Sequence, residues 1–122
     1  MSDAAFDTNI LIDALKGIDQ AQKELARYKR RYISRLTWAE IMTCALPEDA
    51  GRAERFLSYF TVTEISEEVA RRAASLRAER KRLTLADALT LASAQVAGRI
   101  LVTRNSKDFP ANMLGIRVPY TL

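Results

Sequence analysis

The sequence predicts an α/β fold in three layers, an α/β/α arrangement with a short, mostly parallel central sheet. Two features of the chain predict it. Short apolar or β-prone runs alternate with longer segments of helical spacing. The most apolar run does not alternate apolar and polar residues, as a strand with one solvent-exposed face would. Because each parallel crossover needs a helix, this order favours a parallel sheet that helices cover on both faces. Ligands of such folds bind beyond the carboxyl ends of the strands, where the strand order reverses.

The predicted elements follow one another without a linker or an internal repeat. Strands are expected at residues 4–6, 32–33, 61–65, 100–103 and 117–118. Helices are expected between them, at residues 9–16, 19–31, 35–46, 48–60, 66–80 and 84–98. We expect the whole chain, residues 1–122, to form a single domain.

The amino-terminal elements have clear ends. The apolar run that closes with Phe6 stops at Asp7, and apolar residues of helical spacing follow it. The next helix is expected to run through helix-forming residues as far as Arg31. The third is expected to begin near residues 35 to 37, where Thr37-Trp38-Ala39-Glu40 has the Thr-x-x-Glu form of a capping box, and Pro47 ends it.

The carboxyl-terminal elements are defined in the same way. Residues 61–65 alternate like a strand, and Ser66 is suited to cap the helix after them. Thr84-Leu85-Ala86-Asp87 is a second capping-box pattern, at the head of a helix that Gly98 ends. One buried stripe of that helix is expected at Leu85, Leu89, Ala92 and Val96, with further apolar surface at Ala88, Leu91, Ala94 and Ala97.

Composition excludes several classes of protein. The chain has 122 residues, of which 48% are hydrophobic and 28% charged, as in globular proteins that fold. No apolar run approaches the roughly 20 residues of a membrane-crossing helix, and acidic residues stand where a signal peptide would be basic and then apolar. The one cysteine, Cys44, cannot close an internal disulfide. We therefore expect a cytoplasmic protein with no membrane partner.

The absence of histidine limits the chemistry further. With 0 His in the chain, catalytic triads, imidazole-ligated zinc sites and histidine general bases are excluded. If the protein is an enzyme, carboxylates must do the work, alone or through a hard metal ion. A net charge of +4 suits a polyanionic partner.

Asp7 and Glu40 are the first two candidate site residues. Asp7 directly follows the first strand, where it is equally suited to cap the next helix. Glu40 has a structural alternative too, because it would complete the capping box behind Thr37.

Asp87 and Asp108 are the other two candidates. Asp87 is the only charged residue between Leu83 and Gly98, and a partly buried carboxylate is costly unless it is paired or bound to a metal. Capping with Thr84 would satisfy part of this need. Asp108 follows the most apolar strand, in a loop with Asn105 where an Asx turn is also ordinary.

The four carboxylates are expected to converge at one edge of the sheet. Strand ends place Asp7 and the 105–108 loop there, and the helices headed by Glu40 and Asp87 can point their first turns at the same edge. A site made only of oxygen donors favours Mg²⁺ or Mn²⁺ over zinc or copper. Without a cation, like charges at close range would keep at least one carboxylate protonated.

These motifs resemble the PIN domain, and most closely the VapC toxins of VapBC toxin–antitoxin systems. The match lies in Phe6-Asp7-Thr8-Asn9, Trp38-Ala39-Glu40-Ile41, Leu85-Ala86-Asp87-Ala88 and Leu101-Val102-Thr103-Arg104-Asn105-Ser106-Lys107-Asp108-Phe109. It extends over nearly the whole chain, with four separate motifs in the family's order.

The resemblance implies a Mg²⁺- or Mn²⁺-dependent endoribonuclease in which Asp7, Glu40 and Asp87 form the acidic core. Family members commonly have an acid at the position of Asn105, of Asp108, or of both, so here Asp108 is expected to supply the remaining negative charge. Cleavage by metal-activated water would leave a 5′-phosphate and a 3′-hydroxyl. The residues expected to orient the carboxylates and metal waters are Thr8, Asn9, Thr103, Asn105 and Ser106.

Expectations about partners follow from the same resemblance. They are a structured RNA such as transfer or ribosomal RNA, a cognate antitoxin and a second copy of the chain in a homodimer. Arg104 is the favoured substrate contact. Basic residues that are either further RNA contacts or a solvated face are Arg27, Lys29, Arg30, Arg31, Arg77, Arg80 and Lys81. Residues that either pack in the core or face a dimer mate or antitoxin are Leu11, Ile12, Trp38, Met42 and Leu46.

Two other functions fit the sequence less well, and a third, a nuclease of RNA maturation, stays open. A phosphoryl-accepting receiver domain would need adjacent acids after the first strand, where the chain has only Asp7 followed by Thr8 and Asn9. A non-catalytic PIN-like RNA-binding module would lose an acid, for which Asn105 is the one indication. A PIN nuclease of RNA maturation would have the same site residues as a toxin.

Overall fold

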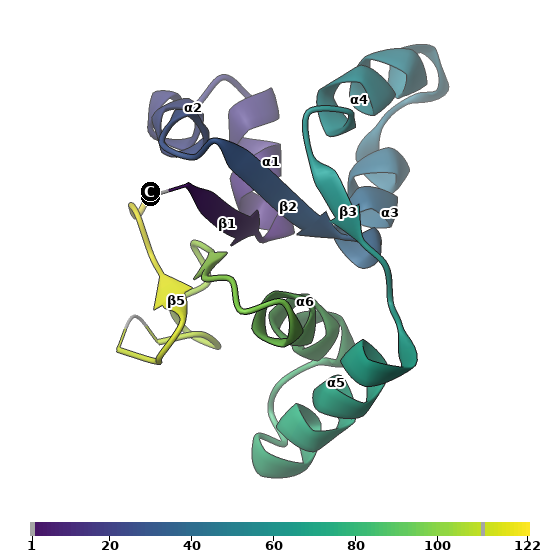
Figure 1. Ribbon diagram of the computed structural model, residues 1–122. Helices are drawn as coiled ribbons and strands as arrows, with labels where there is room; N and C mark the ends of the chain where they lie inside the picture. Colours follow the sequence, from purple (N-terminus) through teal and green to yellow (C-terminus); the bar gives the residue numbers. More distant parts are fainter. Residues whose placement is uncertain (1, 111) are drawn as a thin grey trace.

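The computed structural model describes residues 2–110 and 112–122, and in it a five-stranded sheet lies between two layers of helices (Figure 1). The strands are β1 (Asp3–Phe6), β2 (Arg30–Ser34), β3 (Thr61–Thr63), β4 (Leu101–Val102) and β5 (Ile116–Arg117). The α-helices are α1 (Thr8–Leu15), α2 (Asp19–Ala26), α3 (Arg35–Cys44), α4 (Ala50–Leu57), α5 (Glu67–Glu79) and α6 (Leu85–Val96). The predicted three-layer α/β/α fold is confirmed.

The strand order puts the first strand of the chain at the centre of the sheet. The order is β3-β2-β1-β4-β5, and every pair of neighbours is parallel. The chain runs outward from β1 through β2 to β3 and then returns to the other side of β1 as β4, so the order reverses between β1 and β4. Phe6 lies opposite Val102 in the register, so the residues after these two strands emerge side by side.

Each face of the sheet has its own core. Successive side chains of a strand point to opposite faces, so Ala4 and Phe6 face one helical layer and Ala5 faces the other. The first core also takes Ile10, Leu11, Tyr28, Ile33, Ile41, Leu57, Phe60 and Val102. The second takes Val69, Ala73, Leu76, Leu83, Ala88, Leu91, Leu101 and Phe109. Full burial of a large apolar side chain stabilises the fold by about 1.5–3 kcal/mol.

Two predicted helices differ from the structure. The helix expected at 19–31 ends at Ala26, because Arg30 and Arg31 pair with β1 as the first residues of β2. Their side chains remain accessible, so a basic, helix-forming sequence is compatible with an extended backbone there. The helix expected at 48–60 is shorter as well: Pro47–Asp49 form a 3₁₀ turn, and only Ala50–Leu57 are α-helical.

The buried side of α6 is also different from the one expected. Leu85, the first residue of the helix, is 56% exposed. The helix lies between the sheet and α5 (Figure 1), and the small residues among its buried positions allow both neighbours to approach closely. Those positions are Ala88, Thr90, Leu91, Ala92, Ser93 and Ala94. Within the described ranges no helix has the length and apolar character needed to cross a membrane.

Candidate functional site

Asp7 lies at the point where the strand order reverses and is almost completely buried, with 7% of its surface exposed. It caps α1: its Oδ1 accepts a hydrogen bond from the Thr8 amide at 2.8 Å, and its Oδ2 accepts one from the Thr103 hydroxyl at 2.8 Å. Burial raises the pKa of Asp7 above its ordinary value, although the bonds from Thr103 and Thr8 oppose this. Asp87 and Glu40 raise it further by repulsion.

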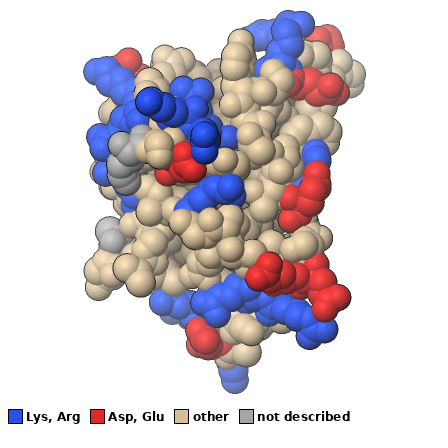
Figure 2. Space-filling model, in the orientation of Figure 1, with Lys and Arg blue, Asp and Glu red and all other residues tan. Residues whose placement is uncertain are grey.

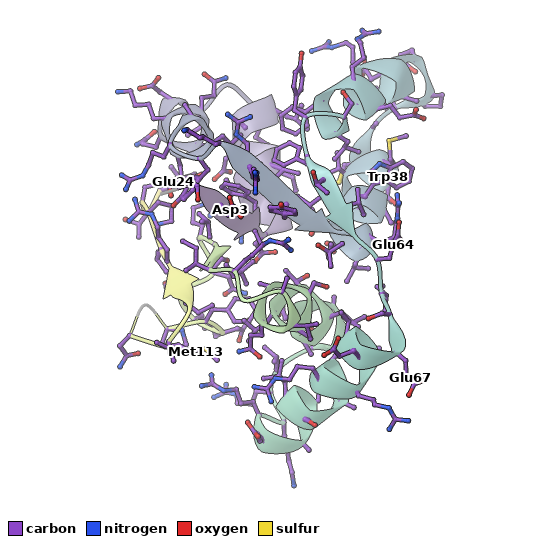
Figure 3. All side chains as sticks on the ribbon, viewed as in Figure 1. Asp3, Glu24, Trp38, Glu64, Glu67 and Met113 are labelled. Atoms are coloured by element: carbon purple, nitrogen blue, oxygen red, sulfur yellow. The ribbon has the colours of Figure 1, made fainter. Side chains whose placement is uncertain are left out.

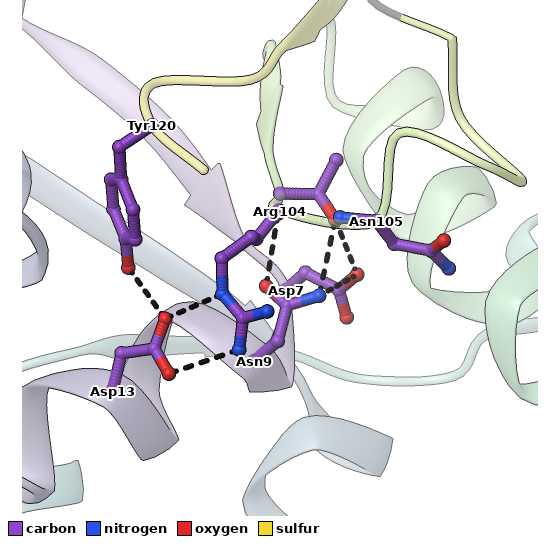
Figure 4. A network of polar contacts seen from close by, with 7 residues as sticks. Asp7, Asn9, Asp13, Arg104, Asn105 and Tyr120 are labelled. Atoms are coloured by element: carbon purple, nitrogen blue, oxygen red, sulfur yellow. Dashed lines mark hydrogen bonds and ion pairs between the residues drawn. The ribbon is translucent and has the colours of Figure 1, made fainter. Parts of the chain in front are cut away.

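A hydrogen-bond network joins the residues that follow β1 to those that follow β4 (Figure 4). The Asn9 Oδ1 accepts the amide of Arg104 at 3.1 Å, and the Thr103 hydroxyl accepts the amide of Asn105 at 3.0 Å. The Asn9 Nδ2 lies 3.4 Å from both Asp7 Oδ2 and Thr103 Oγ1. Asn9 and Thr103 therefore hold the loop after β4 in a fixed position beside Asp7.

Glu40 does not cap its helix, contrary to the alternative that the sequence suggests. The N-cap of α3 is Ser34, whose hydroxyl accepts the amide of Thr37, so Glu40 lies in the second turn of the helix. Its Oε1 accepts a hydrogen bond of 2.6 Å from the Thr8 hydroxyl, which also lies 3.0 Å from the Thr37 hydroxyl. Glu40 is thus turned toward α1 and Asp7, and the capping interpretation is wrong.

Asp87 lies in the first turn of α6, where Thr84 caps the helix by accepting the Asp87 amide at 3.1 Å. The predicted cap is confirmed. The Asp87 side chain is partly buried, and burial raises its pKa above the ordinary value, while hydrogen bonding to Thr84 lowers it. Repulsion from Asp108 and Glu40 raises it again, so three of the candidate carboxylates share one electrostatic environment.

Asp108 is held by the other polar residue of its loop. The Asn105 Nδ2 donates to Asp108 Oδ2 at 3.2 Å, and the Asp108 amide donates to Asn105 Oδ1 at 3.3 Å. This reciprocal turn is the structural alternative expected from the sequence, and it orients a carboxylate that acts electrostatically on Asp87. Ser106 is exposed beside it, and Phe109 is completely buried and anchors the loop.

The donors at this edge fit a hard divalent cation. They are carboxylate oxygens, with the Asn105 amide oxygen beside them. Within residues 2–110 and 112–122, no three acidic or cysteine side chains converge tightly enough to form a ready-made metal site. Mg²⁺ retains several of its waters and uses only one or two carboxylates directly, so spaced carboxylates suit it. Burial and, to a smaller extent, repulsion between the carboxylates raise the pKa values of Asp7 and Asp87, and such an ion would offset the repulsion.

Arg104 forms an ion pair with the buried Asp13, which the sequence analysis did not predict. Its Nε and Nη2 bind Asp13 Oδ2 and Oδ1 at 2.7 and 3.0 Å, and the Tyr120 hydroxyl donates to the same Oδ2 at 2.8 Å (Figure 4). Asp13 is 2% exposed, and although burial opposes its ionisation, Arg104 and Tyr120 hold its pKa below the ordinary value. One sequence signal was available: Asp13 lies among the apolar residues of α1, three positions after Ile10.

A second buried carboxylate is paired in the same way at the opposite edge of the sheet. Glu24 is 4% exposed, and it accepts hydrogen bonds from Arg117 Nε and Nη2 at 2.7 and 3.0 Å and from the Tyr28 hydroxyl at 2.9 Å. Figure 3 shows Glu24 with Asp3 toward the amino-terminal end of β1, whereas Glu64 lies past the carboxyl end of β3. Glu24 is therefore separate from the candidate site.

The basic residues lie in several regions of the face drawn in Figure 2. Lys and Arg gather at the end of the molecule occupied by α5 and on the side occupied by α2, in both places with acidic residues among them. Some are committed to internal contacts: the Nε of Arg31 donates to the Leu25 carbonyl at 2.7 Å, and that of Arg77 to the Leu83 carbonyl at 2.9 Å. Arg80 and Lys81 are exposed.

Comparison with known proteins agrees with the fold and with the motifs. The sequence profile of the PIN domain matches residues 4–111. A chain in a toxin–antitoxin complex from Klebsiella pneumoniae is 41% identical and superposes with a TM-score of 0.92, over 98% of this chain and 99% of that one. A search of curated protein sequences finds no significant match.

More distant solved structures share the fold. A chain of VapBC from Salmonella typhimurium, solved bound to DNA, is 24% identical with a TM-score of 0.78, over 96% of each chain. A chain of FitAcB from Neisseria gonorrhoeae is 21% identical with a TM-score of 0.79, over 98% of this chain and 99% of that one.

Proposed function

The chain belongs to the PIN domain family, and from this premise we propose that it is a Mg²⁺- or Mn²⁺-dependent endoribonuclease and the toxin of a type II toxin–antitoxin pair. One observation carries the proposal. Carboxylates from three separate elements, Asp7 after β1, Glu40 on α3 and Asp87 on α6, interact electrostatically where the strand order reverses. The 41% identity to a chain of a toxin–antitoxin complex supports the toxin assignment.

The residues that would hold the cation are Asp7, Glu40, Asp87 and Asp108, with Asn105 as a neutral oxygen donor. Bound there, a divalent cation would activate water for in-line attack on a phosphodiester and neutralise charge on the leaving oxygen. Thr103 and Thr8 donate hydrogen bonds that fix the orientation of Asp7 and Glu40. A carboxylate held in a fixed orientation by such bonds is positioned to bind a cation or one of its waters.

The remaining polar residues position the loop after β4. Asn9 accepts the Arg104 amide, and Asn105 orients Asp108. Both guanidinium contacts of Arg104 go to Asp13, and about a third of the Arg104 side chain, 32%, is exposed. Contact between that exposed part and a substrate phosphate stays a prediction, and Ser106 lies exposed in the same loop.

A cognate antitoxin is the proposed protein partner. Of the apolar residues that the sequence offered for an interface, Leu11 is completely buried in the core, and Ile12, Trp38 and Met42 are partly buried against it, whereas Leu46 is 59% exposed. A groove of about 450 Å³ beside α1, α3 and α4 is lined mainly by apolar side chains, among them the 47% exposed Leu15. This surface supports a protein partner or the second copy of a homodimer.

Cleavage of total cellular RNA tests the proposal. Protein purified free of any antitoxin is incubated with Mg²⁺ or Mn²⁺ and, in parallel, with EDTA, and the Asp87→Asn variant is the matched control. Discrete fragments with 5′-phosphate ends that require both the cation and Asp87 are expected. Failure of folded wild-type protein to cut any RNA in the presence of metal would favour the alternative of a non-catalytic RNA-binding module. Transfer and ribosomal RNA fragments would be the first to map.

A further inference from the structure

We propose that a basic hollow next to the acidic cluster binds the phosphate backbone of the RNA substrate beside the cleavage point. The hollow has a volume of about 330 Å³ and is lined by Arg80, Lys81, Arg82, Leu83, Lys107, Asp108 and Pro110. The inference rests on the proposed nuclease function, which it deepens by placing the substrate strand. It adds Arg82 and Lys107 to the residues expected to contact RNA.

The basic side chains around the hollow outnumber the one acidic side chain that lines it, that of Asp108. In the part of the chain that the structure describes, no ion pair or side-chain hydrogen bond involves the basic groups of Arg80, Lys81, Arg82 or Lys107. Some basic residues elsewhere on the surface are paired with acids, as Arg71 is with Glu67 and Arg35 with Glu64. Four cations and one carboxylate line the hollow, so an anion that binds there meets a net positive charge.

The two loops that carry these cations are held in place by buried anchors. In the loop between α5 and α6, Leu83 is 3% exposed; its amide donates to the Arg80 carbonyl at 3.0 Å, and its carbonyl accepts from Arg77 at 2.9 Å. In the loop after β4, the amide of the completely buried Phe109 donates to the Asn105 carbonyl at 3.0 Å. Little loop entropy is therefore lost when a phosphate binds.

Asp108 connects the hollow to the candidate site. It lines the hollow, and its charge also acts on Asp87 in the acidic cluster. If the scissile phosphate of an RNA chain binds at the acidic cluster together with a cation, a neighbouring phosphate of the same chain would lie among the basic residues. The acidic cluster alone would repel RNA, so a basic site at its border gives the strand a place to bind before it is cut.

RNA binding without cleavage tests the hollow. The full chain, freed of any partner, is titrated into a labelled single-stranded RNA oligonucleotide in EDTA across a range of KCl concentrations. The test variant is Arg82→Gln/Lys107→Gln. The matched control is Lys23→Gln/Arg55→Gln, which removes the same charges from exposed residues of α2 and α4, helices that cover the other face of the sheet. Thermal unfolding verifies that both variants are folded.

We expect the test variant to bind at least about tenfold more weakly near 0.1 M salt, with a log–log salt slope reduced by about 1.4, which is about 0.7 for each lost phosphate contact. The charge-preserving Arg82→Lys/Lys107→Arg variant is expected to bind like wild type. Equal affinities of the test and control variants would overturn the proposal, as would a loss confined to a DNA oligonucleotide of the same sequence.

Cleavage measured on the same preparations separates this inference from the proposed function. If cleavage requires the metal and Asp87 but the test variant binds RNA as well as wild type does, the proposed RNA site in the hollow is wrong and the proposed nuclease function is supported. If wild-type protein cuts no RNA but the test variant binds RNA more weakly than wild type does, the RNA site in the hollow is supported and the proposed nuclease function is wrong.

Discussion

The guanidinium of Arg104 lies against both carboxylate oxygens of Asp13, residues that are 91 positions apart in the chain. Arg104 begins the loop that leads to Asn105 and Asp108, and Asp13 lies on the helix that Asp7 caps. The pair therefore fixes the distance between two parts of the acidic edge. The Tyr120 hydroxyl adds the carboxyl-terminal segment to the same buried carboxylate.

The first prediction concerns this pair. Replacing Asp13 by Ala leaves a partly buried guanidinium without its partner, and we expect a loss of about 2–4 kcal/mol in the free energy of unfolding, measured by urea denaturation. The double variant Asp13→Leu/Arg104→Met is expected to lose less than the sum of the single variants, since it leaves no charge uncompensated. Strictly additive losses would show that the contact contributes no coupling energy.

Acid sensitivity follows from the buried carboxylates that are paired with arginine. The pKa values of Asp13 and Glu24 are lowered in the folded state. Each ion pair therefore stabilises the protein at pH values above the ordinary carboxyl pKa, and this stabilisation is lost as the pH falls through the lowered pKa. Arg117→Met should flatten the decline in melting temperature between about pH 4 and pH 2 relative to wild type. Arg71→Met, at an exposed pair, is the control, and an equal flattening there would contradict this assignment.

Asp87 should show the opposite sign. The pKa of Asp87 is raised in the folded state by burial and by repulsion from Asp108 and Glu40. Ionisation of Asp87 therefore destabilises the fold, and stability is lost as the pH rises from the unfolded-state pKa to the folded-state pKa. In metal-free buffer at pH 7, Asp87→Asn should melt about 1–3 °C higher than wild type, and the difference should vanish below the ordinary pKa of aspartate. A lower melting temperature at pH 7 would instead show that the capping contribution dominates.

The sequence predicted the fold because its strands and helices are separated by sharp local signals. The run that ends at Phe6, the cap at Thr84 and the apolar strand before Thr103 each lie where the pattern put them. The helix that was expected as far as Arg31 was wrong because β pairing with Asp3 overrides helix propensity, and only the tertiary structure contains that pairing.

The candidate site was less accessible to sequence reasoning. Asp7 and Asp87 could be proposed because each occupies a strand end or an apolar helix, where a carboxylate is costly. The role of Glu40 was obscured because Ser34, three residues before Thr37, was a second possible cap, and the structure uses it. Asp13 and Tyr120 were missed because their contact with Arg104 joins segments that no local pattern relates.

Metal binding should be visible in stability as well as in activity. For a dissociation constant of about 1 mM, 10 mM Mg²⁺ should raise the melting temperature of wild type by about 3–6 °C, because the ion binds only the folded state. The increase should be larger at pH 8 than at pH 5.5, since protons compete for carboxylates whose pKa values are raised.

Two aspartate variants provide the comparison for that measurement. Asp7→Asn should lose most of the Mg²⁺ response, whereas Asp19→Asn, at an exposed residue on α2 paired with Lys23, should keep it. A full response in Asp7→Asn would mean that the cation does not depend on Asp7.

The last prediction concerns the hydroxyl of Thr8, which joins α1 to α3 by donating to Glu40 at 2.6 Å. Thr8→Val keeps the shape of the side chain but removes the donor, so we expect a loss of about 1 kcal/mol in stability and about tenfold in the rate of metal-dependent RNA cleavage. Thr8→Ser should restore both, since it returns the hydroxyl. Thr43→Val is the matched control, because its exposed hydroxyl donates only to the Ala39 carbonyl within α3. If Thr8→Val lost stability but cut RNA at the wild-type rate, the bond to Glu40 would serve packing between the helices and not the orientation of the carboxylate.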